Sequence, residues 1–213
     1  MRRGFLLILS LLIPATALGQ EVGDVEITAL GGWQYGGTQE FYNYIGYPSG
    51  DLHANANWNY GGALTFFPSP YNGIELQYTY QGTDLLLRPN GIQPFKITDL
   101  STHYAHIYGI RVTPLGSPRA EGYVMGGLGA TVYTTDIYED RWLFSLGGGG
   151  GVRLNLNERV ALRLQGRILV PLQFTSVGVY FGGAGGGVTV GGGSAIVQGD
   201  VSAGLTIKIG GRS

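Results

Sequence analysis

The sequence predicts an all-β fold, an eight-stranded antiparallel up-and-down transmembrane β-barrel. Three observations favour it: segments in which apolar and polar residues alternate, connections that alternate between short and long, and a secretory signal at the N-terminus. Successive side chains of a strand point to opposite faces, so alternation predicts strands with one apolar and one polar face. In a barrel that spans a membrane, the apolar face meets lipid and the polar face lines the lumen.

Residues 1–19 have the three parts of a signal peptide. Two arginines precede the apolar run Phe5–Ile13, and the small residues of Ala17–Gly19 predict cleavage before Gln20, with a cut after Ala17 as the alternative. The run is shorter than the about 20 residues of a membrane-spanning helix, which favours a cleaved signal over an anchor. We therefore expect residues 20–213 to form one domain.

Eight segments alternate well enough to be strands. In chain order they are Val25–Tyr35, Trp58–Phe67, Gly73–Gln81, Leu100–Thr113, Glu121–Tyr133, Trp142–Asn155, Val160–Leu172 and Ser194–Ile209. The third is the most regular, because its even positions from Ile74 to Tyr80 are apolar or aromatic and its odd positions from Glu75 to Gln81 are polar. Five of the others show which face is polar through the following sets. The polar faces carry Glu26, Thr28 and Gln34 in the first segment, Arg153 in the sixth, Arg163, Gln165 and Arg167 in the seventh, and Ser202, Thr206 and Lys208 in the eighth. The opposite, apolar faces carry Val25, Ile27, Ala29 and Trp33 in the first segment, Leu162, Leu164 and Ile168 in the seventh, and Val201, Leu205 and Ile207 in the eighth. In the second segment Trp58, Tyr60, Leu64 and Phe66 share the apolar face.

The fourth and fifth segments are less regular. In the fourth, Tyr104, Tyr108, Ile110 and Val112 share one face, and Ser101, His103 and Arg111 share the other. We take the second set as the lumen side because it is polar. The fifth segment has no clearly polar side, so its facing stays open.

The connections sort by length. Those after the second, fourth and sixth segments are short turns, whereas Gly36–Asn57, Gly82–Asp99 and Gln173–Gly193 are long. Membrane barrels have short periplasmic turns and longer extracellular loops, and a soluble β-sandwich, the alternative fold, has no reason to sort its loops. Trp33, Tyr35, Trp58, Tyr80 and Trp142 fall near the loop ends, where an aromatic girdle is expected.

The composition excludes several classes of function. Cys is absent, which removes disulfides, thiolate metal sites and a lipoprotein anchor. The basic residues are dispersed, so no nucleic-acid partner is expected. Runs of glycine lack the Lys-Ser/Thr ending of a phosphate-binding loop, and we expect no cofactor.

The charged residues of the polar faces are the main candidate site. Strand phase places Glu26, Glu75, Arg111, Arg153, Arg163, Arg167, Asp200 and Lys208 in the lumen. The interior of an eight-stranded barrel is just wide enough for side chains, and buried charges must pair. We therefore expect an ion-pair network that plugs the barrel, with Glu26 or Glu75 paired to Arg111, Arg163 or Arg167. A narrow gated ion path through the network is the alternative.

No catalytic or metal site is predicted. Ser101 and His103 share a face two residues apart, but their phase points inward, away from lipid, and His106 is expected to face outward. The loop acids Asp136, Glu139 and Asp140 are expected to be solvated.

The chain resembles the small eight-stranded outer-membrane barrels of the OmpA-transmembrane-domain and OmpX type, a porin-like β-barrel family. The resemblance lies in Gly122–Gly129, Gly147–Arg153 and Val160–Arg167, and in a C-terminal assembly signal of Ser202, Gly204, Ile207 and Ile209, although the family usually ends on an aromatic residue. It implies the outer membrane of a diderm bacterium, outer-membrane lipid and lipopolysaccharide around the barrel, and the barrel-assembly machinery as a partner during biogenesis.

Three functions follow as hypotheses. The first is a non-enzymatic barrel with a structural or adhesive role, in which the loop residues Phe41, Tyr42, Tyr44 and Tyr47 contact a surface ligand or a host or protein partner. The second is a narrow small-solute or ion channel. The third is a lipid-modifying outer-membrane enzyme, which is least favoured because the candidate Ser–His pair is expected to face the lumen.

Overall fold

The structure is a computed structural model that describes residues 23–44, 47–117, 119–137, 139–173, 177–182, 185–190, 194–195 and 197–209. The predicted signal peptide 1–19 and its cleavage before Gln20 lie outside the described residues. Among the residues that are described, no helix is long and apolar enough to cross a membrane.

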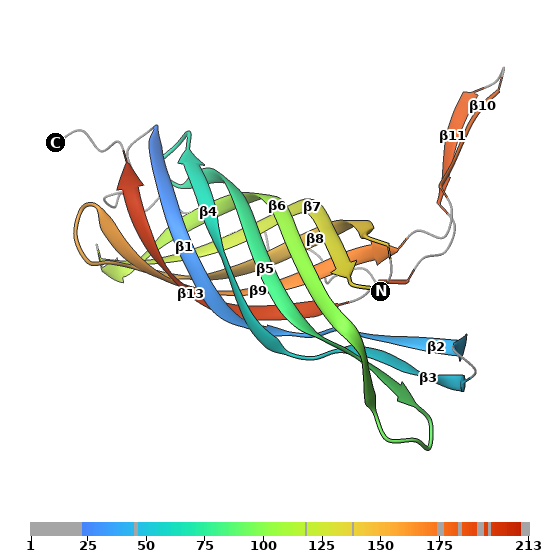
Figure 1. Ribbon diagram of the computed structural model, residues 1–213. Helices are drawn as coiled ribbons and strands as arrows, with labels where there is room; N and C mark the ends of the chain where they lie inside the picture. The colour runs from blue at the N-terminus through green and yellow to red at the C-terminus, as the bar shows by residue number, and fades with distance from the viewer. Residues whose placement is uncertain are drawn as a thin grey trace, which may run out of the picture.

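Eight antiparallel strands close into a ring (Figure 1). They are β1 (Asp24–Tyr35), β4 (Asn57–Phe67), β5 (Asn72–Pro89), β6 (Phe95–Ser117), β7 (Ala120–Thr135), β8 (Arg141–Asn155), β9 (Val160–Gln173) and β13 (Gln198–Ile209). Each of these strands pairs with the one that precedes it and the one that follows it in this list. The pairing of β13 with β1 closes the ring and extends from Val25 opposite Ile209 to Tyr35 opposite Gly199. The predicted eight-stranded up-and-down barrel is therefore confirmed.

At the loop end of the barrel, the structure has more and longer strands than the sequence predicts. The expected connection Gly36–Asn57 contains β2 (Thr38–Tyr44) and β3 (Tyr47–Ala54), and β3 pairs with the outer part of β5. β5 and β6 also continue into the expected connection Gly82–Asp99, and only residues 90–94 connect them, with a φ of 80° at Gly91. Two further strands, β10 (Val177–Gly182) and β11 (Gly185–Val190), lie in the last expected connection. The predicted eighth strand begins later than expected: its first residues form the short β12 (Ser194–Ala195), which pairs with β9, and β13 starts at Gln198.

The alternation of the third predicted strand, the core of β5, is as expected. Glu75, Gln77 and Thr79 are buried in the lumen, whereas Ile74, Leu76 and Tyr78 are about half exposed on the outside. The same holds for β1, β4, β9 and β13, whose polar faces point inward. For β7, whose facing the sequence left open, Glu121, Tyr123 and Met125 point inward.

The predicted facing of β6 is wrong. Tyr104, Tyr108, Ile110 and Val112 point into the lumen, and Ser101, His103 and Arg111 point outward. The register with β5 decides this, because Tyr108 lies opposite Glu75 and residues directly opposite in a sheet share a face. The apolar face of β6 can point inward because its side chains pack into a small apolar core at the turn end of the lumen. That core consists of Phe67, Tyr108, Ile110, Val112, Tyr123 and Met125.

Glycines on β7 and β8 make room for large lumen side chains of β6. Tyr108 lies opposite Gly127, and Gly127 lies opposite Gly147. A Cβ at Gly147 would lie 2.5 Å from the Tyr108 hydroxyl, closer than real contacts allow. The tyrosine therefore lies along the wall over two strands that carry no side chain at its level.

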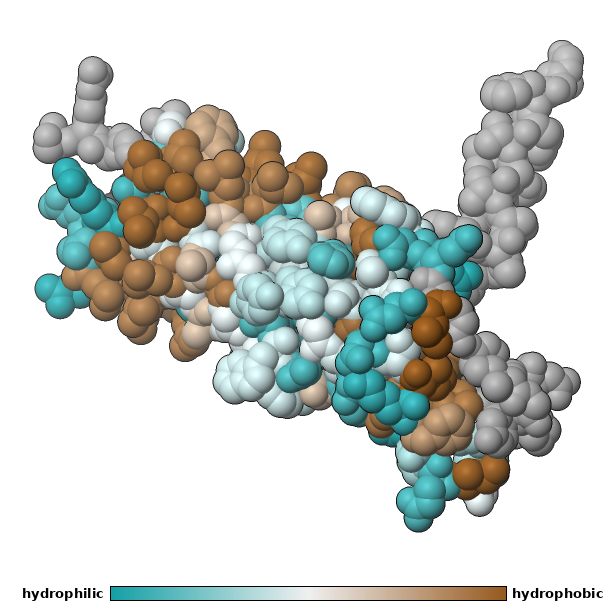
Figure 2. Space-filling model, viewed as in Figure 1, coloured by the Kyte–Doolittle hydropathy of each residue, from teal (hydrophilic) through white to brown (hydrophobic). Residues whose placement is uncertain are grey.

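The outer surface changes character along the barrel axis (Figure 2). Aliphatic side chains gather over the half nearest the turns, and paler aromatic surface follows toward the loop end. The aliphatic band includes Ile27, Leu64, Ile74, Leu76, Leu164 and Leu205, and the aromatic band includes Trp33, Tyr35, Trp58, Tyr60, Tyr78 and Trp142. This order is that of a lipid-facing belt bordered by an aromatic girdle.

Candidate functional site

Three arginine–carboxylate pairs occupy the lumen one above another. The pair nearest the turns joins Arg153 of β8 to Glu26 of β1, with Nη2 2.5 Å from Oε1. A second carboxylate, Glu121 of β7, lies 3.7 Å from Arg153 Nε. The guanidinium also lies over the ring of Phe67, 5.8 Å from its centroid, so it is bounded by acid on two sides and by an aromatic face.

The middle pair joins Arg163 of β9 to Glu75 of β5 across the barrel. Arg163 donates from Nη1 to Oε2 at 2.6 Å and from Nη2 to Oε1 at 2.9 Å, the two-bond geometry that suits a guanidinium and a carboxylate. Thr65 donates a further hydrogen bond of 2.8 Å to Glu75, and Arg163 Nε donates to the Tyr123 hydroxyl at 2.7 Å. Each charged group thus has neutral hydrogen-bond partners as well as its counter-ion.

The third pair joins Arg167 of β9 to Asp200 of β13, the next strand of the wall. Arg167 Nε lies 3.1 Å from both carboxylate oxygens, and Nη2 contacts Oδ2 as well as the hydroxyl of Thr79, which is 3.0 Å away on β5. Asn59 of β4 donates to Asp200 at 3.3 Å. The side chains therefore span the lumen from β9 and β13 to β4 and β5.

A neutral network closes the lumen above the third pair. Gln34 donates to the Tyr104 hydroxyl at 2.6 Å, and that hydroxyl donates to Gln198 at 2.6 Å. All three side chains are buried. Ion pairs thus fill the lumen from the turn end to its middle. The neutral side chains of Gln34, Tyr104 and Gln198 fill the part nearer the loop end.

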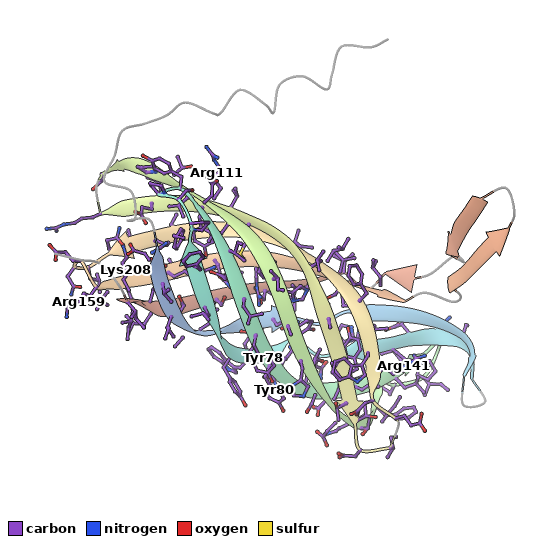
Figure 3. All side chains as sticks on the ribbon, turned by 90° about the horizontal axis from the view of Figure 1, so that it is seen from above. Tyr78, Tyr80, Arg111, Arg141, Arg159 and Lys208 are labelled. Atoms are coloured by element: carbon purple, nitrogen blue, oxygen red, sulfur yellow. The ribbon has the colours of Figure 1, made fainter. Side chains whose placement is uncertain are left out.

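The structure brings together six of the eight residues predicted for the lumen network: Glu26, Glu75, Arg153, Arg163, Arg167 and Asp200. Lys208 has the expected phase opposite Glu26 but lies half-buried at the turn end. The predicted place of Arg111 in the lumen is wrong. Arg111 is exposed on the outside of the barrel and donates a hydrogen bond of 3.3 Å to Asn72 (Figure 3). It was misplaced because β6 turns its apolar face inward.

Sequence reasoning missed the neutral partners of the network. Thr65, Thr79 and Asn59 sit on polar faces that were recognised, but their contacts depend on which strands face each other across the barrel. Glu121 and Tyr123 were missed because their strand has no regular polar face. Only the register of the closed sheet identifies these residues.

The histidines and serines also differ from expectation. His106 points into the lumen, where its Nε2 lies 2.7 Å from Ser145 Oγ and its ring stacks on Tyr108. It reaches Ser145 over Gly129, which separates the two in the sheet. Ser101 and His103 face outward, and their polar atoms bond to Tyr80 at 3.1 Å and to Tyr78 at 2.8 Å. The buried Ser145–His106 contact has no third group on His106 Nδ1 among the described residues, so the orienting partner of a nucleophile–base pair is missing there.

The residues predicted for assembly and for loop contacts occupy distinct places. On β13, Ser202 is buried, Ile207 and Ile209 face outward, and a Cβ at Gly204 would lie 2.5 Å from the carbonyl oxygen of Ala29. Only glycine therefore allows β13 to approach β1 this closely. Phe41, Tyr42, Tyr44 and Tyr47 lie in the β2–β3 hairpin, and their side chains lie outside the described residues.

The rim beyond the barrel carries its own charges. Lys96 Nζ lies 2.7 Å from Asp84 and 2.7 Å from Asp99. These hydrogen bonds, to Asp84 first and then Asp99, raise the pKa of Lys96, and the hydrogen bond from Lys96 lowers the pKa of Asp99. On β3, burial and then the nearby Arg88 lower the pKa of His53, which Asp51 partly offsets.

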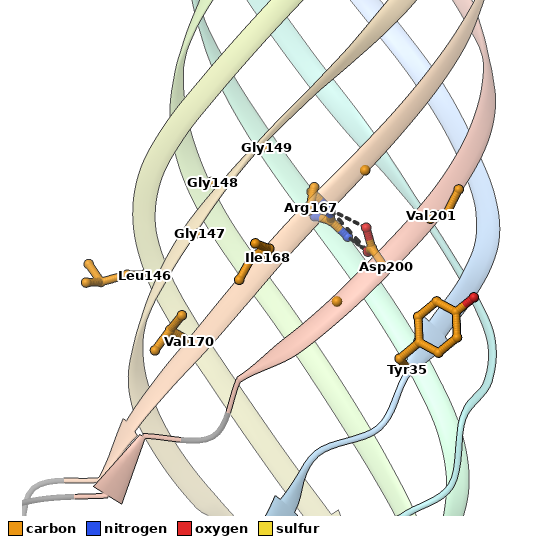
Figure 4. Close-up of a pocket in the computed structure, with 12 residues that line it drawn as sticks. Tyr35, Leu146, Gly147, Gly148, Gly149, Arg167, Ile168, Val170, Asp200 and Val201 are labelled. Carbon is orange, nitrogen blue, oxygen red and sulfur yellow. Dashed lines mark hydrogen bonds and ion pairs between the residues drawn. The ribbon is translucent and has the colours of Figure 1, made fainter. Parts of the chain in front are cut away.

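A groove of about 680 Å³ lies on the outer wall over β8, β9 and β13, where glycines of all three strands, most of them on β8, line it (Figure 4). Outward side chains of Tyr35, Leu146, Ile168, Val170 and Val201 border it, and glycine backbone forms much of its floor. The Arg167–Asp200 pair lies at that floor, so charged side chains separate the groove from the lumen.

No protein-family model matches the sequence, and no curated protein matches it. Solved structures match it in fold. The outer membrane protein OprG from Pseudomonas aeruginosa matches with a TM-score of 0.63 and 15% identity, over 92% of this chain and all of that one. The outer membrane protein AlkL, solved in lipid bilayers, gives 0.56 and 14% over 94% and 97% of the two chains. Neisserial surface protein A gives 0.55 and 14% over 88% and 99%. The chain therefore shares the fold of small outer-membrane β-barrel proteins.

Proposed function

We propose that this chain is a non-enzymatic barrel of the bacterial outer membrane with a side-chain-filled lumen, and that its role is structural or adhesive. The stack of three arginine–carboxylate layers carries the proposal, because their guanidinium groups lie across a lumen that side chains alone can fill. A solute would have to separate buried ion pairs, which costs several kcal/mol for each pair. Function then falls to the outer surface and the loop end.

The membrane setting is supported by the aliphatic belt, its aromatic border and the fold shared with OprG and AlkL. In that setting a cleaved signal peptide delivers the chain, lipid and lipopolysaccharide surround it, and the assembly machinery reads Ser202, Gly204, Ile207 and Ile209. A place among the OmpA-transmembrane-domain and OmpX barrels stays a prediction from sequence resemblance.

The loop end supports a role in surface contact. The β2–β3 hairpin continues the barrel sheet through the pairing of β3 with β5, and it carries Phe41, Tyr42, Tyr44 and Tyr47. Aromatic side chains give large contact area at little entropic cost. In this proposal, a surface ligand or a host or protein partner contacts this hairpin.

Labelling of intact cells tests this arrangement, because the chain has no cysteine of its own. Asn43→Cys in the hairpin should react with a membrane-impermeant maleimide on whole cells. Glu158→Cys in the turn between β8 and β9 is the matched control and should react only after the outer membrane is opened. The reverse pattern, or equal labelling of both, would contradict the proposed location and orientation.

One observation favours the narrow channel as a second candidate. Among the described residues, buried polar atoms of Gln77, His106 and Thr131 have no hydrogen-bond partner, and such atoms usually bond to internal water. A chain of internal waters between the ion pairs would give ions or small solutes a path.

A lipid-modifying enzyme has weaker support. Ser101 and His103 face outward, but each is hydrogen-bonded to a tyrosine. Mass analysis of lipid A with and without expression tests that activity.

A further inference from the structure

A polar and aromatic cluster lies on the outer wall of β4, β5 and β6. It consists of Tyr60, Tyr78, Tyr80, Ser101 and His103, and Figure 3 places Tyr78 and Tyr80 on the outer side of the wall. The Tyr78 hydroxyl lies 2.8 Å from His103 Nδ1, and the Tyr80 hydroxyl lies 3.1 Å from Ser101 Oγ. The rings are packed as well: Tyr80 lies 5.2 Å from Tyr60 and 5.1 Å from His103, measured between centroids.

The cluster marks a change in chemistry along two adjacent strands. The outward positions of β5 run Ile74, Leu76 and then Tyr78 and Tyr80, and those of β6 run from Ile107 to His103 and Ser101. The change occurs at one level, since Tyr80 lies opposite His103 and Leu76 lies opposite Ile107. If the aliphatic residues meet hydrocarbon, the cluster meets the headgroups just beyond it.

The hydrogen bonds within the cluster leave it able to bind more. Each hydroxyl has one donor and two acceptor positions, and each of the two bonds uses only part of that capacity. The Tyr78 bond uses Nδ1 of His103, and no hydrogen bond within the described residues uses Nε2. Hydroxyls, an imidazole nitrogen and ring faces held in fixed positions form a surface that recognises a ring bearing several hydroxyl groups.

The charges nearby select a neutral group. Asp84 and Asp99 lie opposite each other on the outer face two residues beyond Gly82 and Ser101, and Lys96 pairs with both. This group carries one net negative charge, which repels phosphate at short range. The cluster itself contains no arginine or lysine. A sugar ring fits this combination of neutral hydrogen bonding, aromatic faces and adjacent acid better than a phosphate.

We infer that Tyr60, Tyr78, Tyr80, Ser101 and His103 form a binding site for the sugar headgroup of a glycolipid in the outer leaflet. The inference rests on the proposed outer-membrane location and deepens it by naming a lipid class and a site. The hydroxyls and His103 bond to ring hydroxyls, and Tyr60 and Tyr80 offer ring faces. The acyl chains of the same lipid then lie along Leu76 and Ile107.

Affinity for lipid A in detergent micelles tests the site. The folded protein is titrated with diphosphoryl lipid A, with lipid A stripped of both phosphates, and with phosphatidylglycerol. We expect lipid A without phosphates to bind at least as tightly as the diphosphoryl form, because the acidic group beside the cluster repels phosphate, and phosphatidylglycerol to compete poorly. Tyr78→Phe and His103→Ala should each weaken lipid A binding by up to about tenfold, as expected for one or two lost hydrogen bonds.

Trp142→Phe is the matched control, because Trp142 is an exposed aromatic of the same band on the far strand β8. It should leave affinity unchanged. A heat-modifiability gel establishes that each variant is folded, and Ser101→Ala offers a second variant with a minimal change. Equal weakening in the control, unchanged affinity in Tyr78→Phe and Ser101→Ala, or binding that requires the phosphates would overturn the inference. The cysteine labelling above is independent of these variants, so failure of the proposed location is distinguished from failure of this site.

Discussion

Arg163 holds Glu75 through two parallel hydrogen bonds of 2.6 and 2.9 Å, across the lumen from β9 to β5. Both side chains are almost fully buried. The pair links two strands that are not neighbours in the sheet, so it fixes the cross-section of the barrel as well as filling it.

Glu75→Gln should destabilise the barrel by about 3–5 kcal/mol, because it leaves a buried arginine without its counter-ion. Reversible unfolding in lipid vesicles measures the loss. The double variant Glu75→Gln with Arg163→Met removes both charges and should recover much of the stability. If the single variant unfolds like the unmodified protein, the Arg163–Glu75 pair contributes little and the lumen is hydrated enough to replace it.

Adjacent positions on β9 test the two faces of the wall. Leu164 points outward, so Leu164→Arg should cost about 2–4 kcal/mol when it lies near the middle of the bilayer. Gln165 points into the lumen, and Gln165→Glu should cost less because it places a carboxylate on the same face as Arg163 and Arg167. Equal losses at the two positions in vesicle unfolding would indicate that both faces are buried in protein, as in a sandwich.

Arg111 tests the facing of β6, and Arg153 of β8 provides a buried arginine for comparison. Arg111 is exposed and makes one hydrogen bond of 3.3 Å to Asn72, so Arg111→Ala should change the free energy of unfolding by no more than about 0.5 kcal/mol. Arg153 is buried against Glu26, and Arg153→Ala should cost about 3–5 kcal/mol. A large loss at Arg111 would return that side chain to the lumen.

The β2–β3 hairpin should depend on pH through His53. Burial, and then Arg88, lower the pKa of His53 below its ordinary value of 6.5, and Thr38 Oγ1 lies 2.8 Å from its Nδ1. A lowered pKa means that the folded hairpin favours the neutral ring. Its stabilisation is therefore present above the ordinary pKa and is lost as pH falls through the folded pKa.

Amide hydrogen exchange at Thr38 and His53 measures this effect. Protection should fall as pH drops below about 6.5 once intrinsic exchange rates are corrected. In His53→Gln, which cannot titrate, the corrected protection should not change over the same range. Protection that rises on acidification would show that protonated His53 is favoured, contrary to its position beside Arg88.

Sequence predicted the parts of the barrel where one face is plainly polar. The pattern from Ile74 to Gln81 placed Glu75 in the lumen, and the same reasoning placed Arg163, Arg167 and Asp200 there. It failed on β6, because alternation identifies two faces but not which one meets lipid. Tyr108 and Ile110 look lipid-facing by composition, yet they belong to an apolar core inside the lumen.

Contacts between distant strands could not be predicted in detail. The Ser145–His106 contact depends on Gly129 between them, and the Arg153–Glu121 contact depends on the phase of a strand without a regular pattern. The strand extensions at the loop end were missed because Gly82–Asp99 was interpreted as one long connection. In the structure β5 and β6 remain paired as far as Leu87 and Phe95, and only residues 90–94 connect the two strands.

Single-channel recording in planar bilayers tests the closed lumen most directly. The unmodified protein should give no steady conductance, because ion pairs and the Gln34–Tyr104–Gln198 network span the lumen. Glu75→Gln should admit brief, small openings by loosening the middle layer, and Arg111→Ala, which changes only the outer surface, should behave like the unmodified protein. A large and steady conductance in the unmodified protein would contradict the plugged barrel and establish the channel in its place.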